Sequence, residues 1–255
     1  MSPKVALITG ASRGVGAAVA RALAADGDTS IVLNYGSNPE PAQSLIQDLE
    51  SLRDNNIWST ENPRFQALKA DMADRADIRR LVNQTVQEMG RLDIVVSNVG
   101  WTRMTDFANL EEADDEADWD RCFNMNVKSH FFLFQECRKY LEKTQGAFIA
   151  TASVAGVKPS GSSLPYAVTK AALIHLAKSL AAIAAPNIRV NTVSPGVLLT
   201  DWGRQFPEEK LDAVREKNVL KRFATPEDVA EQVKFLANSK SITGTNVVID
   251  AGFSL

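Results

Sequence analysis

Short apolar runs rich in β-branched residues alternate with longer amphipathic segments along almost the whole chain. Each short run suits a buried parallel strand, and each longer segment suits a helix that crosses over the sheet. The predicted strands are Val5–Thr9, Ser30–Asn34, Arg64–Ala70, Leu92–Ser97, Gly146–Thr151, Arg189–Val193 and Asn246–Ile249. The predicted helices are Val15–Ala25, Pro41–Arg53, Arg75–Glu88, Trp119–Glu142, Tyr166–Ala184, Pro207–Lys217 and Pro226–Leu236. The pattern predicts a single α/β domain over residues 1–255, a doubly wound seven-stranded parallel sheet flanked by helices.

Composition agrees with a folded globular domain and excludes some functions. Hydrophobic residues make up 45% of the chain and charged residues 23%, and the net charge is 28 − 31 = −3. This charge gives no reason to expect binding to a nucleic-acid backbone. We find no apolar run near the roughly 20 residues that span a bilayer, so no membrane contact is expected. The first strand begins near Lys4, which leaves no room for a signal peptide, and a cytoplasmic location is expected.

The few cysteines and histidines favour packing over metal binding. Cys122, Cys137, His130 and His175 all fall in segments with helical periodicity, and no two of them have metal-ligand spacing. We expect both cysteines to be packed. We also expect both histidines to be at least partly buried, with no metal site.

Two segments interrupt the alternation. Asp54–Pro63 is polar and ends in proline, so we expect an exposed loop. The run Leu110–Asp120 carries seven acidic residues, which a solvated surface and a negatively charged helix N-terminus explain. A docking site for a basic partner is the weaker alternative.

Tyr166 and Lys170 lie one helical turn apart, so they share one helix face. A phenol has a pKa near ~10, and a nearby ammonium favours its ionised form. We therefore expect Lys170 to lower the pKa of Tyr166 towards the range useful in acid–base catalysis. Ser153 follows a predicted strand thirteen residues upstream. In isolation the pair also fits an accidental spacing on an amphipathic helix.

A glycine-rich segment, Thr9–Gly16, follows the first predicted strand. Its glycines, Gly10, Gly14 and Gly16, have the spacing Gly-x-x-x-Gly-x-Gly. Such a loop gives a tight turn and close backbone approach to a pyrophosphate, and the next helix points free N–H groups at the phosphates. We predict that Ser12 and Val15 also contact the dinucleotide. A strand–helix turn with fortuitous glycines is the alternative.

The end of the second predicted strand favours NADP(H) over NAD(H). An acidic residue there would bind the adenosine ribose hydroxyls and repel a 2′-phosphate. The chain has Asn34, Tyr35 and Ser37 in this region and no carboxylate. Arg13, in the glycine loop, can bind the phosphate bidentately, although an ordinary surface arginine is the alternative.

Residues after the third and fourth predicted strands complete the expected cofactor wall. Asp71 and the backbone of Met72 are placed to meet the adenine edge. Gly100 permits close approach of the cofactor beside Val99. For Asn98 we favour a structural role in locking neighbouring strands while it forms part of the same wall.

Together these residues resemble the classical short-chain dehydrogenase/reductase family, over nearly the whole chain. The matching motifs are Thr9–Gly16, Asp71, Ser97–Gly100, Asn126, Ser153, Tyr166, Lys170 and Arg189–Gly196. Two positions depart from the family pattern: Ser97 replaces the first asparagine of Asn-Asn-Ala-Gly, and Val99 replaces its alanine. The resemblance implies a Rossmann fold and an oxidoreductase that uses a nicotinamide cofactor, for which the residues above favour NADP(H).

The resemblance also implies a role for each catalytic position. Tyr166 exchanges a proton with the substrate oxygen, and Ser153 hydrogen-bonds the same oxygen. Lys170 lowers the pKa of Tyr166 and holds the nicotinamide ribose. Asn126 anchors a water that returns protons to the pair. Members of the family commonly assemble as homotetramers or homodimers through long helices.

The segment after the sixth predicted strand resembles the family's nicotinamide turn and substrate lid. Pro195 and Gly196 form the turn, Thr200 reaches the carboxamide or pyrophosphate, and a lid is expected at about residues 198–217. Candidate substrate-binding residues are Trp101, Ser153, Tyr166, Trp202 and Phe206, with Phe107 nearby.

These aromatic residues favour an apolar small-molecule ketone, although simple packing of the lid explains them equally well. A 3-oxoacyl-(acyl-carrier-protein) type of reductase is the alternative. We rank it lower because Ser179–Asn187 contains no cation for an acidic carrier. A non-catalytic NADP-binding sensor is an alternative of another class, disfavoured because Tyr166 and Lys170 are both present.

Overall fold

Parallel strands form the centre of the molecule. The computed structural model describes residues 2–54 and 63–255, and within them seven strands pair in the order β3-β2-β1-β4-β5-β6-β7. The strands are β1 (Lys4–Ile8), β2 (Thr29–Tyr35), β3 (Phe65–Lys69), β4 (Ile94–Ser97), β5 (Ala147–Thr151), β6 (Arg189–Pro195) and β7 (Asn246–Ile249). All seven predicted strands and their parallel pairing are confirmed, with ends shifted by one or two residues. Most of the predicted loop Asp54–Pro63 lies outside the described residues.

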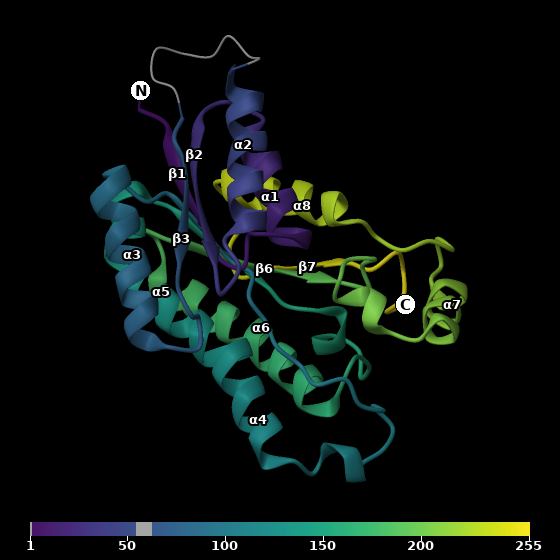
Figure 1. The fold of residues 1–255 in the computed structure, drawn as a ribbon. Coiled ribbons are helices and arrows are strands. Elements are labelled where there is room, and N and C mark those ends of the chain that lie inside the picture. Colours follow the sequence, from purple (N-terminus) through teal and green to yellow (C-terminus); the bar gives the residue numbers. More distant parts are fainter. Residues whose placement is uncertain (1, 55–62) are drawn as a thin grey trace.

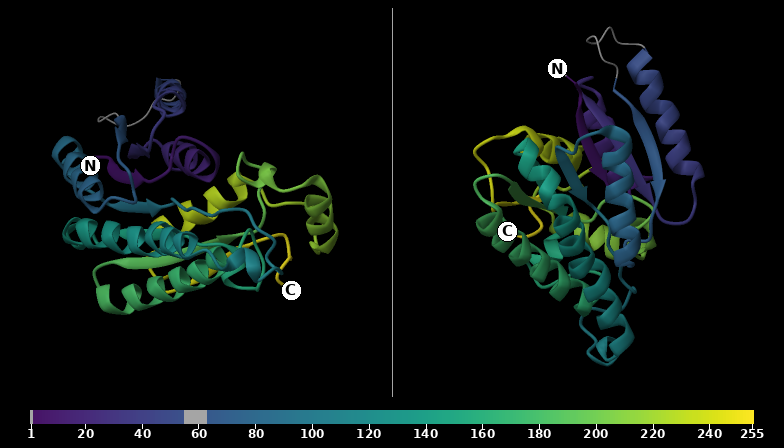
Figure 2. Two further views of the ribbon diagram at one scale, coloured as in Figure 1. Left: turned by 60° about the horizontal axis from the view of Figure 1, so that its bottom comes forward. Right: turned by 90° about the vertical axis from the view of Figure 1, so that its left-hand side faces the viewer.

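Helices cover both faces of this sheet, as Figures 1 and 2 show. Helices α3 (Arg75–Met89), α5 (Ser129–Thr144) and α6 (Leu164–Ala184) pack one hydrophobic cluster against one face. Helices α1 (Gly14–Ala24), α2 (Glu40–Asp54) and α8 (Pro226–Asn238) pack a second cluster against the other face. The layered α/β arrangement predicted from the sequence is therefore confirmed. Helix α7 (Glu208–Lys217) projects from one side of the domain near the C-terminus (Figure 1).

Side-chain caps explain where several helices begin. Asp74 accepts hydrogen bonds from the Ala76 and Asp77 N–H groups at the start of α3, and Thr225 forms a capping box with Asp228 at α8. Ser163 accepts a bond of 3.2 Å from the Tyr166 N–H and so sets the first turn of α6.

The long helix predicted over Trp119–Glu142 is interrupted. It consists of α4 (Glu116–Phe123), a π-helical turn η2 (Asn124–Lys128) and α5. A π turn adds one residue to the helical repeat and often marks a functional site. Hydrophobic periodicity does not detect it because the apolar stripe resumes after the extra residue. The turn contains Asn126, whose side chain is redirected into the protein.

The length and composition of α6 contradict the prediction that the chain has no apolar run near the length of a membrane span. This 21-residue helix is long and apolar enough, by length and composition alone, to cross a bilayer, whereas the sequence analysis found no such run. In the domain α6 packs against β6 and the short helix η3 (Val154–Gly156), and it buries Thr169 and Lys170. Packing inside the protein accounts for part of its apolar character, since 44% of the apolar window is buried.

The cysteines and one histidine are buried as predicted. Cys122, Cys137 and His130 are each no more than 1% exposed, and the Ser97 hydroxyl lies 2.7 Å from His130 Nδ1. His175 is exposed on α6, so the prediction of a buried side chain is wrong there. Among residues 2–54 and 63–255 no cluster of three or more His, Cys, Asp or Glu side chains could hold a metal ion.

Replacing Phe148 tests how much the stability of the protein depends on the packing of the sheet against α5. The Phe148 ring meets Phe134 of α5 edge to face, with centroids 5.4 Å apart, and both are 1% exposed. We predict that Phe148→Ala lowers the free energy of unfolding by about 3–5 kcal/mol, because a buried cavity remains. Urea unfolding checks this. The control Phe235→Ala, at a residue 57% exposed, should change it by less than about 0.5 kcal/mol. Equal effects would contradict this assignment of the core.

Candidate active site

A cavity of about 1060 Å³ lies at the carboxyl ends of the strands. It spans the point where the strand order reverses between β1 and β4, which is where open α/β sheets bind ligands. Most of the predicted site residues line it: Gly10, Ser12, Arg13, Gly14, Val15, Asn34, Tyr35, Ser37, Asp71, Met72, Asn98, Val99, Gly100, Ser153, Tyr166, Lys170, Pro195, Gly196, Thr200, Trp202 and Phe206. Gly16, Trp101 and Asn126 do not line the cavity.

The glycine loop has the geometry that its spacing predicts. Gly10 and Gly14 have φ of 59° and 55°, a conformation that favours glycine. A Cβ on Gly16 would lie 2.6 Å from the Gly10 carbonyl oxygen, so Gly16 serves the packing of α1 on the loop. Arg13 precedes α1 and provides no side-chain cap, which leaves N–H groups of the first turn available to an anion.

Asn98 ties together the ends of three strands. Its backbone N–H donates to Thr9 Oγ1 at 2.9 Å, and its side-chain amide donates to the Thr9 carbonyl at 3.2 Å. Thr151, at the end of β5, donates its hydroxyl to Asn98 Oδ1 at 3.1 Å. The predicted locking role of Asn98 is confirmed.

The end of β2 presents no carboxylate to the cavity. Asn34 is buried; its Oδ1 accepts from the Gly10 N–H at 3.2 Å and its Nδ2 donates to the Ala70 carbonyl at 3.1 Å. This amide therefore positions the glycine loop with bonds inside the protein. Arg13 is exposed beside it and pairs with Asp201 across the cavity at 3.3 Å.

Ser153, Tyr166 and Lys170 meet on one wall. The Ser153 hydroxyl lies near the phenol of Tyr166 and favours its ionised form, and Ser153 Oγ accepts from the Ala155 N–H at 3.2 Å. Lys170 is buried, lies 5.5 Å from the centroid of the Tyr166 ring and donates to the Thr151 carbonyl at 2.8 Å. Gly156 permits this arrangement, because a Cβ there would lie 2.6 Å from the backbone carbon of Lys170. The close contact holds η3, which begins just after Ser153, against α6.

The prediction that Lys170 lowers the pKa of Tyr166 is wrong for the protein alone. Burial raises the pKa of Tyr166 to about 12, and the neighbouring Ser153 hydroxyl opposes this only in part. Burial also lowers the pKa of Lys170 to about 7, which weakens its charge. Both groups therefore favour their neutral forms. A protonated phenol is the form that a proton donor needs.

Asn126 lies behind the cavity wall and is fully buried. Its Oδ1 accepts from the Trp101 N–H at 2.7 Å, and its Nδ2 donates to the Trp101 carbonyl at 2.9 Å and to Thr169 Oγ1 at 3.0 Å. These bonds join the loop after β4 to α6. The ring of Trp101 packs under Arg121, whose guanidinium carbon lies 4.4 Å from the ring centroid. Trp101 is thus turned away from the predicted substrate pocket.

The predicted lid contributes two aromatic residues and several that the sequence analysis missed. The Trp202 ring lies 6.0 Å from the Tyr166 ring, and Phe206 also faces the cavity. Helix α7 adds five residues that were not singled out: Lys210, Leu211, Ala213, Val214 and Lys217. Their spacing along a helix is a signal in the sequence, but only the fold shows which face meets the cavity.

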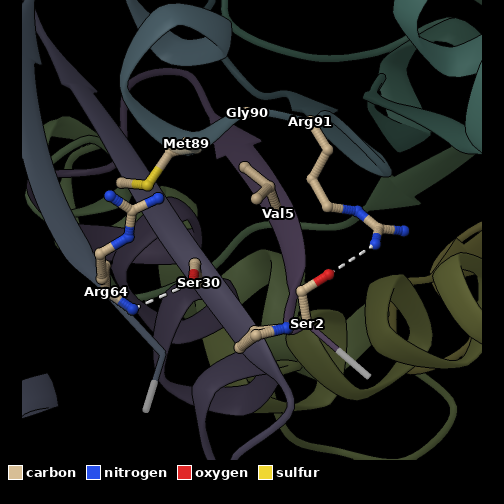
Figure 3. Close-up of a pocket in the computed structure, with 8 residues that line it drawn as sticks. Ser2, Val5, Ser30, Arg64, Met89, Gly90 and Arg91 are labelled. Atoms are coloured by element: carbon tan, nitrogen blue, oxygen red, sulfur yellow. Dashed lines mark hydrogen bonds between the residues drawn. The ribbon is translucent and has the colours of Figure 1, made fainter. Parts of the chain in front are cut away.

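A second cavity, of about 400 Å³, lies at the opposite, amino ends of the strands (Figure 3). Arg64 and Arg91 flank it, and the Arg91 guanidinium bonds Asp93 and the Ser2 hydroxyl. None of the predicted site residues lines this cavity. The chemistry gathers at the carboxyl ends of the strands.

A family model described as enoyl-(acyl carrier protein) reductase, of the short-chain dehydrogenase type, matches residues 10–254. The chain belongs to the short-chain dehydrogenase/reductase family. It is therefore an oxidoreductase that uses a nicotinamide cofactor to interconvert CH–OH and C=O groups.

Two relatives of this short-chain dehydrogenase/reductase are carbonyl reductases by name. A protein assigned as ketoacyl reductase 2 of the granaticin polyketide synthase of Streptomyces violaceoruber is 34% identical, with 98% of this chain and 96% of the relative covered. The 3-oxoacyl-(acyl-carrier-protein) reductase FabG of Thermotoga maritima is 33% identical, with 98% and 97% covered.

Solved structures of the family share the whole fold. A short-chain dehydrogenase from Burkholderia cenocepacia in complex with NADP has a TM-score of 0.88 at 32% identity, with 100% of this chain and 99% of that chain covered. A 7α-hydroxysteroid dehydrogenase in complex with NADH and 7-oxo-glycochenodeoxycholic acid has a TM-score of 0.87 at 26% identity, with 98% and 94% covered. The fold thus accommodates both nicotinamide cofactors.

Proposed function

We propose that this short-chain dehydrogenase/reductase uses NADPH to reduce a ketone to an alcohol, reversibly. One observation carries the proposal: Ser153, Tyr166 and Lys170 share a wall of the cavity that the glycine loop also lines. A carbonyl next to Ser153 and Tyr166 therefore occupies the same cavity as a dinucleotide on the loop. The nicotinamide supplies the hydride.

The chain's own residues stabilise charge and move the proton. Ser153 hydrogen-bonds the carbonyl oxygen, where negative charge develops during reduction. Tyr166, kept protonated by burial, donates its proton to that oxygen. Lys170 holds the nicotinamide ribose and returns a proton to Tyr166 after the transfer. Asn126 acts through its bonds to Trp101 and Thr169, which position the loop and helix around Lys170.

The residues around the cavity fit NADP(H) better than NAD(H). The first turn of α1 offers N–H groups to the pyrophosphate, and no acidic residue ends β2 to repel a 2′-phosphate. Among the described residues Arg13 forms an ion pair with Asp201 alone; this pair is exposed and worth little, so a phosphate can compete for the guanidinium. Asp71 and Met72 line the region expected to hold the adenine.

The substrate proposed is a free small-molecule ketone with an apolar body. Phe107, Trp202 and Phe206 line the cavity beside Tyr166 and support an apolar substrate. Reduction of a carrier-bound 3-oxoacyl group is the second candidate, favoured by the names of the relatives. The lack of cations in Ser179–Asn187 still ranks it lower. The segment from Leu198 to Lys217 acts as the lid, and assembly into a homodimer or homotetramer stays a prediction.

The phenol provides the direct test. We predict that Tyr166→Phe lowers kcat for NADPH-dependent ketone reduction by about 10²–10⁴-fold, because the proton donor is lost while the ring remains. Rates across a ketone panel, monitored at 340 nm, measure this. NADPH affinity and melting temperature should stay close to those of the parent, as should the activity of Tyr140→Phe. Substantial turnover by Tyr166→Phe would refute the mechanism.

Arg13 provides the test of cofactor choice. The unmodified enzyme should have a higher kcat/KM for NADPH than for NADH. Arg13→Ala should raise the KM for NADPH by about 10- to 100-fold and leave NADH nearly unchanged, because charge-assisted bonds to the 2′-phosphate are lost. Arg21→Ala, which removes an exposed pair with Asp48, is the control. Equal losses for both cofactors would contradict this role.

We predict that the Lys170 amine takes up a proton when the cofactor binds. Its pKa of about 7 in the protein alone lies below the ordinary lysine value, so the amine is largely neutral at pH 8. The anionic dinucleotide favours the ammonium and raises this pKa, so a proton is taken up. Calorimetric titration of NADPH at pH 8, in buffers of different ionisation enthalpy, measures the uptake. Lys170→Met should abolish it, and an unchanged uptake would contradict the assignment.

A further inference from the structure

Helix α7 has a sharply divided surface. The side chains that line the cavity are Lys210, Leu211, Ala213, Val214 and Lys217. The two lysines and Val214 recur at intervals of four and three residues, which places them on one helix face. The acidic side chains of α7 do not line the cavity: Glu208, Glu209, Asp212 and Glu216. The lid therefore turns a cationic and apolar face to the cavity.

Lys210 and Lys217 are exposed residues at the edge of the cavity, and neither has an acidic partner among the described residues. Within the described residues no carboxylate forms an ion pair with Lys210 or Lys217, whereas Arg215 on the same helix pairs with Asp212. Lys210 Nζ lies 5.1 Å from the centroid of the Phe206 ring, which holds the charge beside an apolar surface. The positive charge on this side is thus uncompensated.

Other charges of the cavity do not neutralise the α7 lysines. Arg13 and Asp201 pair with each other. Asp71 and Asp106 accept hydrogen bonds from backbone N–H groups two residues further on, within their own turns. Lys170 lies beside Tyr166 and donates to the Thr151 carbonyl. An anion in the cavity therefore finds its uncompensated cations under the lid.

The loose packing of α7 leaves aliphatic side chains that a ligand in the cavity would contact. None of the ten residues of α7, all of which the structure describes, is buried, and Leu211 and Val214 are only half-buried. A ligand with an apolar body and an anionic end would cover the two aliphatic side chains and satisfy the two ammonium groups together.

We propose that Lys210 and Lys217 bind an anionic group of the substrate, remote from the reacting carbonyl. The substrate is then an amphipathic keto acid: its carbonyl lies at Ser153 and Tyr166, its apolar chain lies against the aromatic residues of the lid, and its anion lies under α7. The anion is a carboxylate, or the phosphate of a pantetheine thioester that offers the same chemistry. This inference rests on the proposed ketone reduction.

Matched substrates test the anion directly. The carboxylate arm compares 4-oxopentanoate, 6-oxoheptanoate and 9-oxodecanoate with their methyl esters. The phosphate arm compares acetoacetyl-coenzyme A with its N-acetylcysteamine thioester, which lacks the phosphates. We expect KM to be about tenfold lower for the anionic member of at least one pair, with kcat changed less than twofold. Added NaCl should reduce this difference, since salt screens the attraction.

Substitutions in α7 test whether the two lysines cause the preference for the anionic substrate. Lys210→Met and Lys217→Met keep the aliphatic stem and remove the charge. Each should raise KM for the anionic substrate severalfold, and the double variant should remove the preference without changing KM for the neutral partner. Lys210→Arg should retain it. Arg215→Met, on the same helix but outside the cavity, is the matched control and should behave like the parent enzyme.

The outcomes separate this inference from the proposed function. If the parent enzyme reduces neither member of any pair nor any other ketone with NADPH, the proposed function itself fails, and the anion subsite with it. If it reduces neutral and anionic ketones with equal KM, only the anion subsite is overturned. The same holds if the lysine variants raise the KM for NADPH while the preference for the anion persists.

Discussion

The carboxyl ends of β1, β4 and β5 are held together by one side chain, and the site is built on that junction. Asn98 bonds Thr9 on one side and Thr151 on the other, so a single amide spans three parallel strands. Thr9 leads directly into the glycine loop, and the Thr151 carbonyl accepts the bond from Lys170. The loop for the phosphates and the amine beside the phenol are therefore placed relative to one another by the sheet. A rigid scaffold of this kind suits a reaction that depends on a fixed distance between cofactor and carbonyl.

Burial has a chemical consequence at this junction as well as a structural one. Burial raises the pKa of the Tyr166 phenol and lowers that of the Lys170 amine. Both shifts follow from the cost of a charge in a poorly solvated site. A bound anionic cofactor would favour the charged form of the Lys170 amine. The ammonium beside the phenol therefore forms mainly when the cofactor is present. The Ser153 hydroxyl beside the phenol is the part of this arrangement that the protein provides by itself.

The lid contrasts with this scaffold. Asn126 and Gly156 are held by buried bonds and close contacts, whereas α7 buries none of its described residues. Segments with few buried contacts are the ones that can move at small cost in free energy. The residues proposed for catalysis thus lie on the rigid side of the cavity, and those proposed to select the substrate lie on the loosely packed side. This division fits a family in which one reaction is applied to many carbonyl compounds.

The sequence by itself determined the layered fold and most of the site. Three features are local patterns that can be recognised in a sequence: the strand periodicity, the glycine spacing after β1 and the pair Tyr166 and Lys170. Only the tertiary structure decided the rest, because packing between distant segments has no local signature. It turned Trp101 away from the cavity, inserted a π turn at Asn126, raised the pKa of Tyr166 and placed Lys210 and Lys217 along the cavity. In each case a neighbour far along the chain sets the environment of the side chain, and that environment determines what the side chain can do.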